Sequence, residues 1–168
     1  MKPDLYWIPG SWNGRLAIAA RPRGRDWLGD EMRAWRDAGV NVIVSLLEEP
    51  EAVQLGLSEE AVAAAAEGMR FISFPIPDRG VPTSGAAANS LIAAVLDSVN
   101  AGENVAIHCR QSVGRSGMIG AAVLAGSGMN PDEAIRTVST ARELTVPETV
   151  EQRSWVERLR PLRPVLAR

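Results

Sequence analysis

The chain has 168 residues, 46% of them hydrophobic, and a formal net charge of −2. This composition favours one domain spanning residues 1–168 with a substantial core, and the near-neutral charge excludes a general attraction for nucleic acid or an anionic membrane. Cys109 and His108 are the only cysteine and histidine, which excludes an internal disulfide framework and Cys-rich or His-rich metal sites. The sequence shows no signal-peptide hydrophobic region and no apolar run of transmembrane length, so we expect a cytoplasmic protein.

The first part of the chain alternates predicted strands and helices. Residues 5–9 and 15–20 are predicted strands joined by a Gly-Ser-Trp-Asn-Gly turn, which indicates an opening hairpin. The Arg-rich loop at residues 21–25 is either a solvated turn or a weak attractor of an anionic substrate. Apolar residues at helical spacing predict a helix over residues 27–37, and the unbroken β-branched run at 40–47 predicts a buried parallel strand.

Three glutamates follow that predicted strand: Glu48, Glu49 and Glu51. Carboxylates at the carboxyl end of a parallel strand lie where α/β proteins place their ligands. This segment is therefore either part of a site or a solvated acidic turn, and both interpretations stay open.

The middle of the chain continues the alternation. An Ala-rich helix is predicted over residues 58–67, with Ser58 as its N-cap, and residues 70–75 are the next predicted strand. A hydroxyl residue at 83–84 can cap a long apolar helix that ends at 101–102.

The most informative stretch is residues 105–117. An alternating apolar strand ends at His108-Cys109, a polar loop follows, and a helix of small residues begins near Arg115. Such a loop directs successive backbone amides into one bowl that binds phosphate-like anions, and the same positive field favours the nucleophilic thiolate of Cys109. Arg115 offers a planar fork for two phosphoryl oxygens, and the Ser116 hydroxyl can donate to the sulfur.

His108-Cys109, five intervening residues and Arg115-Ser116 resemble the His-Cys-x5-Arg-Ser/Thr signature of the protein tyrosine phosphatase superfamily, in its dual-specificity-like branch. The resemblance implies a three-layer α/β fold with a mostly parallel central sheet, and it implies that Cys109 is the nucleophile. It also implies that His108 shapes the loop by hydrogen bonding and that Ser116 eases loss of the thiolate. We expect no metal and no organic cofactor, because Arg115 and the loop amides supply the electrostatic stabilisation. The residues implied to hold the phosphoryl group are Arg110, Gln111, Ser112, Val113, Gly114 and Arg115.

Residues 76–82, Ile-Pro-Asp-Arg-Gly-Val-Pro, resemble the superfamily's general-acid loop Trp-Pro-Asp-x-Gly-x-Pro, with Ile76 in place of Trp. Asp78 is then the general acid that protonates the departing oxygen, and the alternative is a Pro-Asp surface turn. The resemblance also implies an acidic partner for Arg115 among the three glutamates. It makes Gln152, in a Pro-Glu-Thr-x-x-Gln pattern, the residue that orients the hydrolytic water, with a solvent-facing helix residue as the alternative.

The last part of the chain is predicted to be helical. Asn130, followed by Pro and an acidic first turn, predicts the N-cap of a helix that runs to about Arg142. A final helix opens after Val146, and the Pro- and Arg-rich tail at 161–168 cannot extend it. We expect the final helix to pack through Val150, Trp155, Val156 and Leu159.

These residues predict a phosphomonoester hydrolase that acts on phosphotyrosine in proteins through a Cys–phosphate intermediate, with phosphoserine and phosphothreonine left open as further substrates. The expected partner is a phosphorylated protein or a small phosphoester, without nucleic acid or membrane insertion, and the sequence indicates no oligomeric state. The alternatives are an inositol phosphate or phosphoinositide phosphatase, a non-catalytic phospho-residue binding module, and a sulfur-transfer or arsenate-reducing protein. Only Arg110 precedes Arg115 as a basic loop residue, which favours protein phosphoesters over inositol phosphates.

Overall fold

The computed structural model describes residues 2–162, so residues 163–168 of the predicted tail lie outside the described part of the chain. Within residues 2–162 the chain forms a five-stranded sheet in the order β1-β2-β5-β3-β4. β1 and β2 form the predicted antiparallel hairpin, and β2, β5, β3 and β4 run parallel to one another. The strands are β1 (Leu5–Ile8), β2 (Leu16–Ala19), β3 (Val42–Ser45), β4 (Arg70–Ser73) and β5 (Val105–His108).

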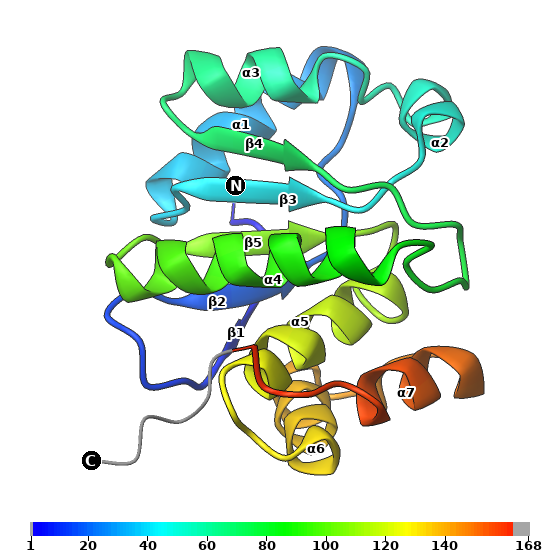
Figure 1. The fold of residues 1–168 in the computed structure, drawn as a ribbon. Coiled ribbons are helices and arrows are strands. Elements are labelled where there is room, and N and C mark those ends of the chain that lie inside the picture. Colours follow the sequence, from blue (N-terminus) through cyan, green and yellow to red (C-terminus); the bar gives the residue numbers. More distant parts are fainter. Residues whose placement is uncertain (1, 163–168) are drawn as a thin grey trace.

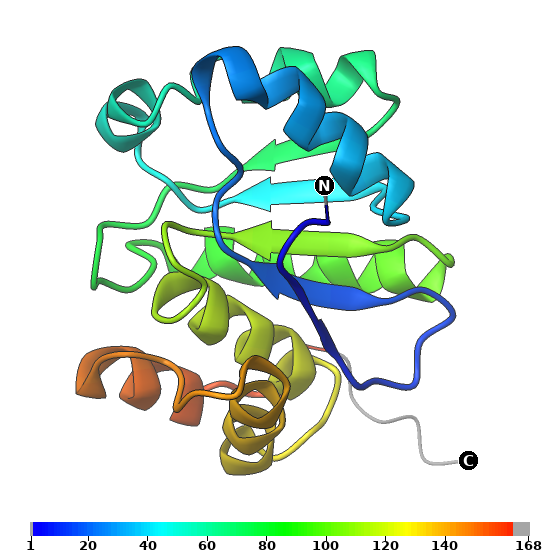
Figure 2. The same cartoon turned by 180° about the vertical axis from the view of Figure 1, so that it is seen from behind.

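Helices cover both faces of the sheet, as Figure 1 and the reverse view in Figure 2 show. α1 and α3 pack on one face, α4 and α5 pack on the other, and α6 and α7 pack against α5. This is the predicted three-layer α/β arrangement with a mostly parallel central sheet. The helical elements are the 3-10 turn η1 (Arg25–Trp27), α1 (Leu28–Asp37), α2 (Glu49–Gln54), α3 (Glu60–Ala66), α4 (Gly85–Asn100), α5 (Arg115–Gly126), α6 (Pro131–Arg142) and α7 (Val150–Glu157).

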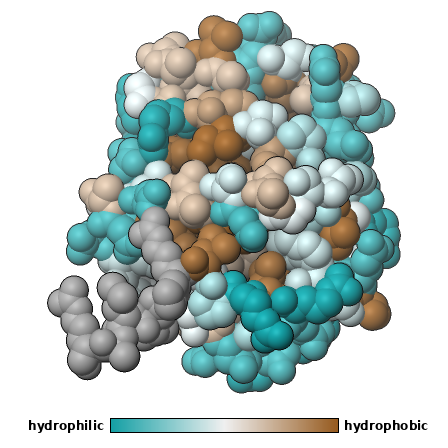
Figure 3. Space-filling model, viewed as in Figure 1, coloured by the Kyte–Doolittle hydropathy of each residue, from teal (hydrophilic) through white to brown (hydrophobic). Residues whose placement is uncertain are grey.

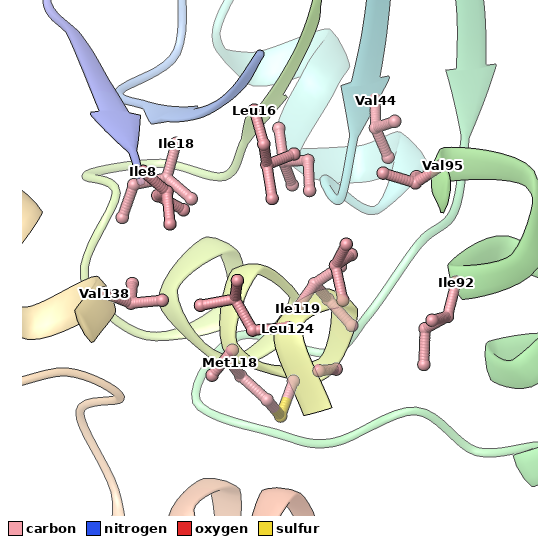
Figure 4. Close-up of a cluster of buried hydrophobic side chains, with 14 of the residues drawn as sticks. Ile8, Leu16, Ile18, Val44, Ile92, Val95, Met118, Ile119, Leu124 and Val138 are labelled. Atoms are coloured by element: carbon pink, nitrogen blue, oxygen red, sulfur yellow. The ribbon is translucent and has the colours of Figure 1, made fainter. Parts of the chain in front are cut away.

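Two hydrophobic clusters lie on opposite faces of the sheet because successive strand residues point to opposite sides. Ile18 and Ile107 belong to the cluster with α4, α5 and α6, which Figure 4 shows in part, whereas Ala19 and Ala106 belong to the cluster with α1 and α3. Every residue of β2, β3 and β5 is buried, which explains the unbroken apolar run in β3. Each large aliphatic side chain buried here stabilises the fold by about 1.5–3 kcal/mol.

Two helix caps follow the sequence closely. The Ser84 hydroxyl accepts a hydrogen bond from the Ala87 N–H at 3.1 Å and begins α4. The Asn130 side chain accepts one from the Asp132 N–H at 2.9 Å and begins α6. Both predicted N-termini are therefore confirmed, because each cap satisfies an amide that the first helical turn leaves without a backbone partner.

Of the two interpretations left open for the segment after β3, the acidic turn is wrong, because the segment is the short helix α2, where Glu48 and Glu51 form a reciprocal capping box. Two local predictions are also wrong. Ser58 does not cap α3, which begins at Glu60 without a side-chain cap. Val150 is 82% exposed and adds nothing to the core, because it is the first residue of α7, whose buried residues are Gln152 and Val156.

No helix within residues 2–162 is both long enough and apolar enough to cross a lipid bilayer. On the face seen in Figure 3, hydrophobic residues form separate groups among hydrophilic ones. Exposed apolar residues of this kind are ordinary on a protein surface.

Candidate active site

The predicted phosphate-binding loop, residues 109–114, connects β5 to α5 at the carboxyl edge of the parallel strands. A pocket of about 240 Å³ opens at this edge. The Cys109 side chain is nearly buried and lines the pocket, and its Sγ lies 3.2 Å from Ser116 Oγ. Once the sulfur is a thiolate, the hydroxyl can only donate to it, and this stabilises the negative charge. The residues that line the pocket are Asp78, Arg79, Cys109, Arg110, Gln111, Val113, Gly114, Arg115 and Glu148.

Arg115 is buried at the first residue of α5 and is held from several sides. Its Nη1 and Nη2 donate to the two carboxylate oxygens of Glu51 at 2.7 and 2.9 Å, and Nη1 also donates to the Ile76 carbonyl at 3.0 Å. Burial alone would lower the pKa of the guanidinium, but the hydrogen bonds and charge of Glu51 outweigh this effect and raise the pKa. Because Glu51 occupies the Nη1/Nη2 edge, a phosphoryl group would bind the edge formed by Nε and Nη2.

Glu51 is the glutamate, of the three named from sequence, that pairs with Arg115. The hydrogen bonds from Arg115 lower the pKa of its carboxyl group, although burial acts in the opposite direction. The same carboxylate accepts the Glu48 N–H at 3.0 Å and so begins α2. Glu51 therefore fixes both the short helix and the orientation of Arg115.

His108 lies behind the pocket, fully buried against α3. Its Nε2 is 2.6 Å from Glu60 Oε1, and its Nδ1 is 3.2 Å from the Cys109 carbonyl oxygen. A carbonyl oxygen only accepts, so we assign a hydrogen to Nδ1, which donates it to the Cys109 carbonyl. His108 thus shapes the loop through its contact with the Cys109 peptide, and Glu60 holds the ring.

The outer part of the loop is tied to α6 by Arg142. Ser112 has a left-handed backbone (φ 61°) and a buried side chain directed away from the pocket. Arg142 Nε donates to Ser112 Oγ at 2.8 Å and to the Ser112 carbonyl at 3.2 Å, and its Nη2 donates to the Gln111 carbonyl at 3.4 Å. The guanidinium also lies 4.3 Å from the ring centroid of Tyr6. Arg142 therefore fixes the Gln111 and Ser112 carbonyls from α6.

Two glycines allow the segment before α7 to approach the loop closely. A Cβ on Gly114 would lie 3.2 Å from Gln152 Oε1 and 3.4 Å from the Glu148 Cβ, and one on Gly117 would lie 2.8 Å from the Val146 Cβ. The 2.8 Å distance is too short for any real contact, so the first turn of α5 and residue 146 can meet only because residue 117 has no side chain.

The general-acid loop forms the opposite wall of the pocket. Asp78 is exposed, and its Oδ1 lies 3.3 Å from Arg115 Nη2. Ile76, in the place where the family loop has Trp, is fully buried in the main core. Asp78 therefore lines the same pocket as Cys109, and its role as the general acid stays a prediction.

Gln152 is buried, so its alternative interpretation as a solvent-facing residue is wrong. Its Oε1 accepts the Thr149 N–H at 3.2 Å in a capping box, and its Nε2 donates to the Gly80 carbonyl at 3.0 Å. The amide therefore braces the general-acid loop from α7. Its assignment to the hydrolytic water stays a prediction.

Arg110 lines the pocket beside Arg115, and its Nε is buried without a hydrogen-bond partner among residues 2–162. A buried donor of this kind is uncommon, because leaving it unsatisfied costs free energy. No group of three or more His, Cys, Asp or Glu side chains in the described chain could hold a metal ion.

Sequence reasoning missed Glu60, Arg142 and Glu148. Each acts on the pocket from a helix or loop far away in the chain, so no local motif contains it. Glu60 carried the best signal, since it is a charged residue near the start of a short helix otherwise made of Ala and Val. The capping box at Thr149-x-x-Gln152 was also readable and would have predicted where α7 begins.

A family model described as "Polymorphic toxin system, DSP-PTPase phosphatase" matches residues 17–129. The matched segment extends from β2 to just beyond α5 and contains both the acid loop and the phosphate-binding loop. Among curated proteins, the comparison found no match.

Solved structures extend the similarity over nearly the whole chain. Tk-PTP in the active form is 28% identical, with a TM-score of 0.75 over 95% of this chain and 100% of that one. Kinase associated phosphatase (KAP), solved with serine in place of its catalytic cysteine, is 16% identical, with a TM-score of 0.84 over 93% of each chain. PTPMT1 is 20% identical, with a TM-score of 0.72 over 90% of this chain and 91% of that one. KAP and PTPMT1 share the fold of this chain.

Proposed function

This chain belongs to the family of DSP-PTPase phosphatases of polymorphic toxin systems, and we propose that Cys109 is the nucleophile with which it hydrolyses phosphomonoesters. The observation that carries this proposal is the convergence of three groups on one pocket: the Cys109 sulfur, the buried Arg115 guanidinium and the Asp78 carboxyl group. Cys109 and Arg115 come from one loop and helix start, whereas Asp78 comes from a separate loop that follows β4, and packing alone would not require the two segments to meet.

In the first step the Cys109 thiolate attacks phosphorus, and a sulfur–phosphorus bond forms as the bond to the leaving oxygen breaks. Arg115 and the amides of residues 110–115 hold the equatorial phosphoryl oxygens, where negative charge must be stabilised. Asp78 gives its proton to the leaving oxygen, which would otherwise depart as an alkoxide or phenoxide.

In the second step water attacks phosphorus, the sulfur–phosphorus bond breaks and inorganic phosphate is released. Asp78, now a carboxylate, accepts the proton of the water. Ser116 donates to the departing sulfur from 3.2 Å. Gln152 uses one amide hydrogen on Gly80, and the other can orient the water.

The proposed substrate is phosphotyrosine in a protein, with phosphoserine and phosphothreonine as further candidates. Charge at the pocket supports a single phosphoryl group. Arg115 is paired with Glu51, and Arg79 with Glu148, so the rim offers little surplus positive charge for a ring that carries several phosphates.

A second candidate is a phosphoinositide or inositol phosphate. PTPMT1, which shares the fold, has been solved in complex with PI(5)P. In this chain the feature that favours such a substrate is Arg110, whose unpartnered Nε lies beside the pocket and could bind a further anionic group.

The test is phosphate release by the purified protein from a phosphotyrosine peptide, a phosphoserine peptide and a phosphoinositide, with Cys109→Ser as the blank. Turnover that disappears in Cys109→Ser would support the cysteine mechanism, and the order of kcat/KM values would identify the substrate class. Orthovanadate binding to Cys109→Ser serves as the control for an intact loop. Activity of Cys109→Ser equal to wild type would overturn the assignment of the nucleophile. Absence of turnover on every substrate, with vanadate still bound, would favour a phospho-residue binding module.

A further inference from the structure

Arg79 and Glu148 meet across the rim of the pocket. The Arg79 Nη1 donates to Glu148 Oε1 at 2.8 Å, and both residues line the pocket beside Asp78. Arg79 directly follows Asp78, whereas Glu148 lies on the segment between α6 and α7. The ion pair therefore joins the general-acid loop to a part of the chain 69 residues away.

The backbone of the acid loop needs such outside support. Arg79 has a left-handed backbone with φ of 61°, which is unfavourable for a residue with a long side chain. A turn with this geometry persists only when surrounding contacts hold it. At Arg79 and Gly80 the Arg79–Glu148 ion pair and the hydrogen bond from Gln152 Nε2 to the Gly80 carbonyl at 3.0 Å do so. Arg115 also holds the loop, through Asp78 Oδ1 at 3.3 Å and the Ile76 carbonyl at 3.0 Å.

Glu148 is itself positioned against the phosphate-binding loop. A Cβ on Gly114 would lie 3.4 Å from the Glu148 Cβ, so the glutamate packs closely over that glycine. The pair consequently sets the position of the acid loop relative to the loop that holds the nucleophile. A shift of Arg79 would move the neighbouring Asp78 away from the leaving group.

We propose that Arg79 and Glu148 are positioning residues that hold the general-acid loop closed, with Asp78 over the bound phosphoester. This inference rests on the proposed function of the same site, and it assigns a role to two residues that the reaction itself does not use. Breaking the pair should impair proton transfer to the leaving group while the nucleophile and the phosphate-binding loop stay intact.

The competing interpretation is that Glu148 only contributes a negative wall to the pocket. Removing its charge would then reduce repulsion of the substrate dianion, which lowers KM and leaves kcat unchanged. The positioning role predicts the opposite pattern. In Glu148→Gln and Arg79→Gln, kcat should fall about two- to fivefold for phenyl phosphate, whose leaving group needs protonation, and fall less for 4-nitrophenyl phosphate.

Glu157→Gln is the matched control. Glu157 is the last residue of α7, its side chain is about 42% exposed and it pairs with Arg153 Nε at 3.5 Å, but it does not line the pocket. The substitution removes the same charge by the same chemistry, and the kcat ratio of the two substrates should equal that of wild type. The exchanged pair, Arg79→Glu with Glu148→Arg, should recover at least part of the lost ratio.

Amide hydrogen exchange tests the same inference without turnover. The Gly80 N–H donates to the Pro77 carbonyl at 2.8 Å inside the acid loop, so its protection reports on the loop's closure. We expect faster exchange of this amide in Glu148→Gln and wild-type exchange in Glu157→Gln. Unchanged exchange in Glu148→Gln, or equal kcat losses on both substrates, would overturn the positioning role. A wild-type protein without turnover would count against the proposed function, and the exchange result would still decide whether the pair holds the loop.

Discussion

The two walls of the pocket are built in contrasting ways. On the wall made by β5 and α5, Cys109 is 3% exposed and Arg115 is 2% exposed, and both are packed into the core of the sheet. On the opposite wall the side chain of Asp78 is 62% exposed and that of Arg79 is 64% exposed. The groups proposed to bind and attack the phosphoryl group are therefore fixed by the fold, whereas the group proposed to supply the proton depends on a few contacts across a loop.

This contrast separates two kinds of damage. A change on the buried wall should disturb binding, chemistry and folding together, because the same side chains are proposed to serve all three. A change on the exposed wall should affect only the steps that move a proton. Substitutions on each side can therefore show whether the two walls act independently.

The largest effect is expected for Arg115→Lys on the buried wall. Lysine keeps the charge but cannot offer two parallel N–H groups to a phosphoryl group and two more to Glu51. We expect kcat/KM to fall about 10²- to 10³-fold, as when one donor to a transition-state oxyanion is removed. Steady-state kinetics on 4-nitrophenyl phosphate measures the loss, and Arg153→Lys, on exposed α7, is the control. A fall in kcat/KM of less than threefold would contradict the proposal that Arg115 binds the phosphoryl group.

Asp78→Asn should cause the next largest loss of activity, and the size of the loss should depend on the substrate. Asparagine has no proton to give, so kcat for an alkyl or phenyl phosphate should fall about 10²-fold or more. The loss should be much smaller for 4-nitrophenyl phosphate, whose leaving group is stable without protonation. Because Asp78 is exposed, the melting temperature should match wild type. Equal losses across a series of leaving groups would argue against Asp78 as the acid.

Arg142→Lys should have a moderate effect, confined to binding. Lysine cannot bridge Ser112 Oγ and the two loop carbonyls at once, so the loop amides should lose part of their preorganisation. We expect the Kd for orthovanadate to rise about tenfold, the size of a lost charged hydrogen bond. The ratio of kcat on good and poor leaving groups should stay that of wild type. A change in that ratio would mean that the two walls are coupled through the loop.

The smallest effect concerns pH. The hydrogen bonds from Arg115 hold the pKa of Glu51 below its ordinary value of 4.5, so the folded state binds this proton less readily than the unfolded chain. The stabilisation is fully present above that ordinary value and is lost as pH falls through the lowered pKa. Urea unfolding at several acid pH values should show a shallower loss of stability in Glu51→Gln than in wild type. Parallel curves would indicate that Glu51 contributes nothing to acid sensitivity.

The features that could be predicted from the sequence are those whose signal lies within a few neighbouring residues. Cys109, Arg115 and Ser116 lie within one short loop and helix start, and Asp78 lies in a Pro-Asp-x-Gly turn, so the resemblance to two short family motifs was enough to name them, and their catalytic roles stay predictions. The hairpin, the parallel sheet and the caps at Ser84 and Asn130 likewise follow from neighbouring residues.

The partners of these residues could not be predicted in the same way. Glu51, Glu60 and Arg142 contact the loop or the residues that flank it across 30 to 64 residues of sequence, and which of many similar charges does so depends on the packing of whole helices. The error at Val150 has a related cause. An apolar residue at the start of a helix can face solvent when the buried face begins one turn later.

Gly117 has no side chain, and this controls how closely residue 146 packs against α5. Any larger residue there would push Val146 outward, and Val146 opens the segment that carries Glu148 and Gln152. The spacing between the nucleophile's helix and the supports of the acid loop thus depends on one position that touches no reacting atom. A substitution at residue 117 should therefore change the position of the general-acid loop, and with it the rate of proton transfer to the leaving group. Cys109, Arg115 and Ser116, which form the phosphatase signature, would be unchanged.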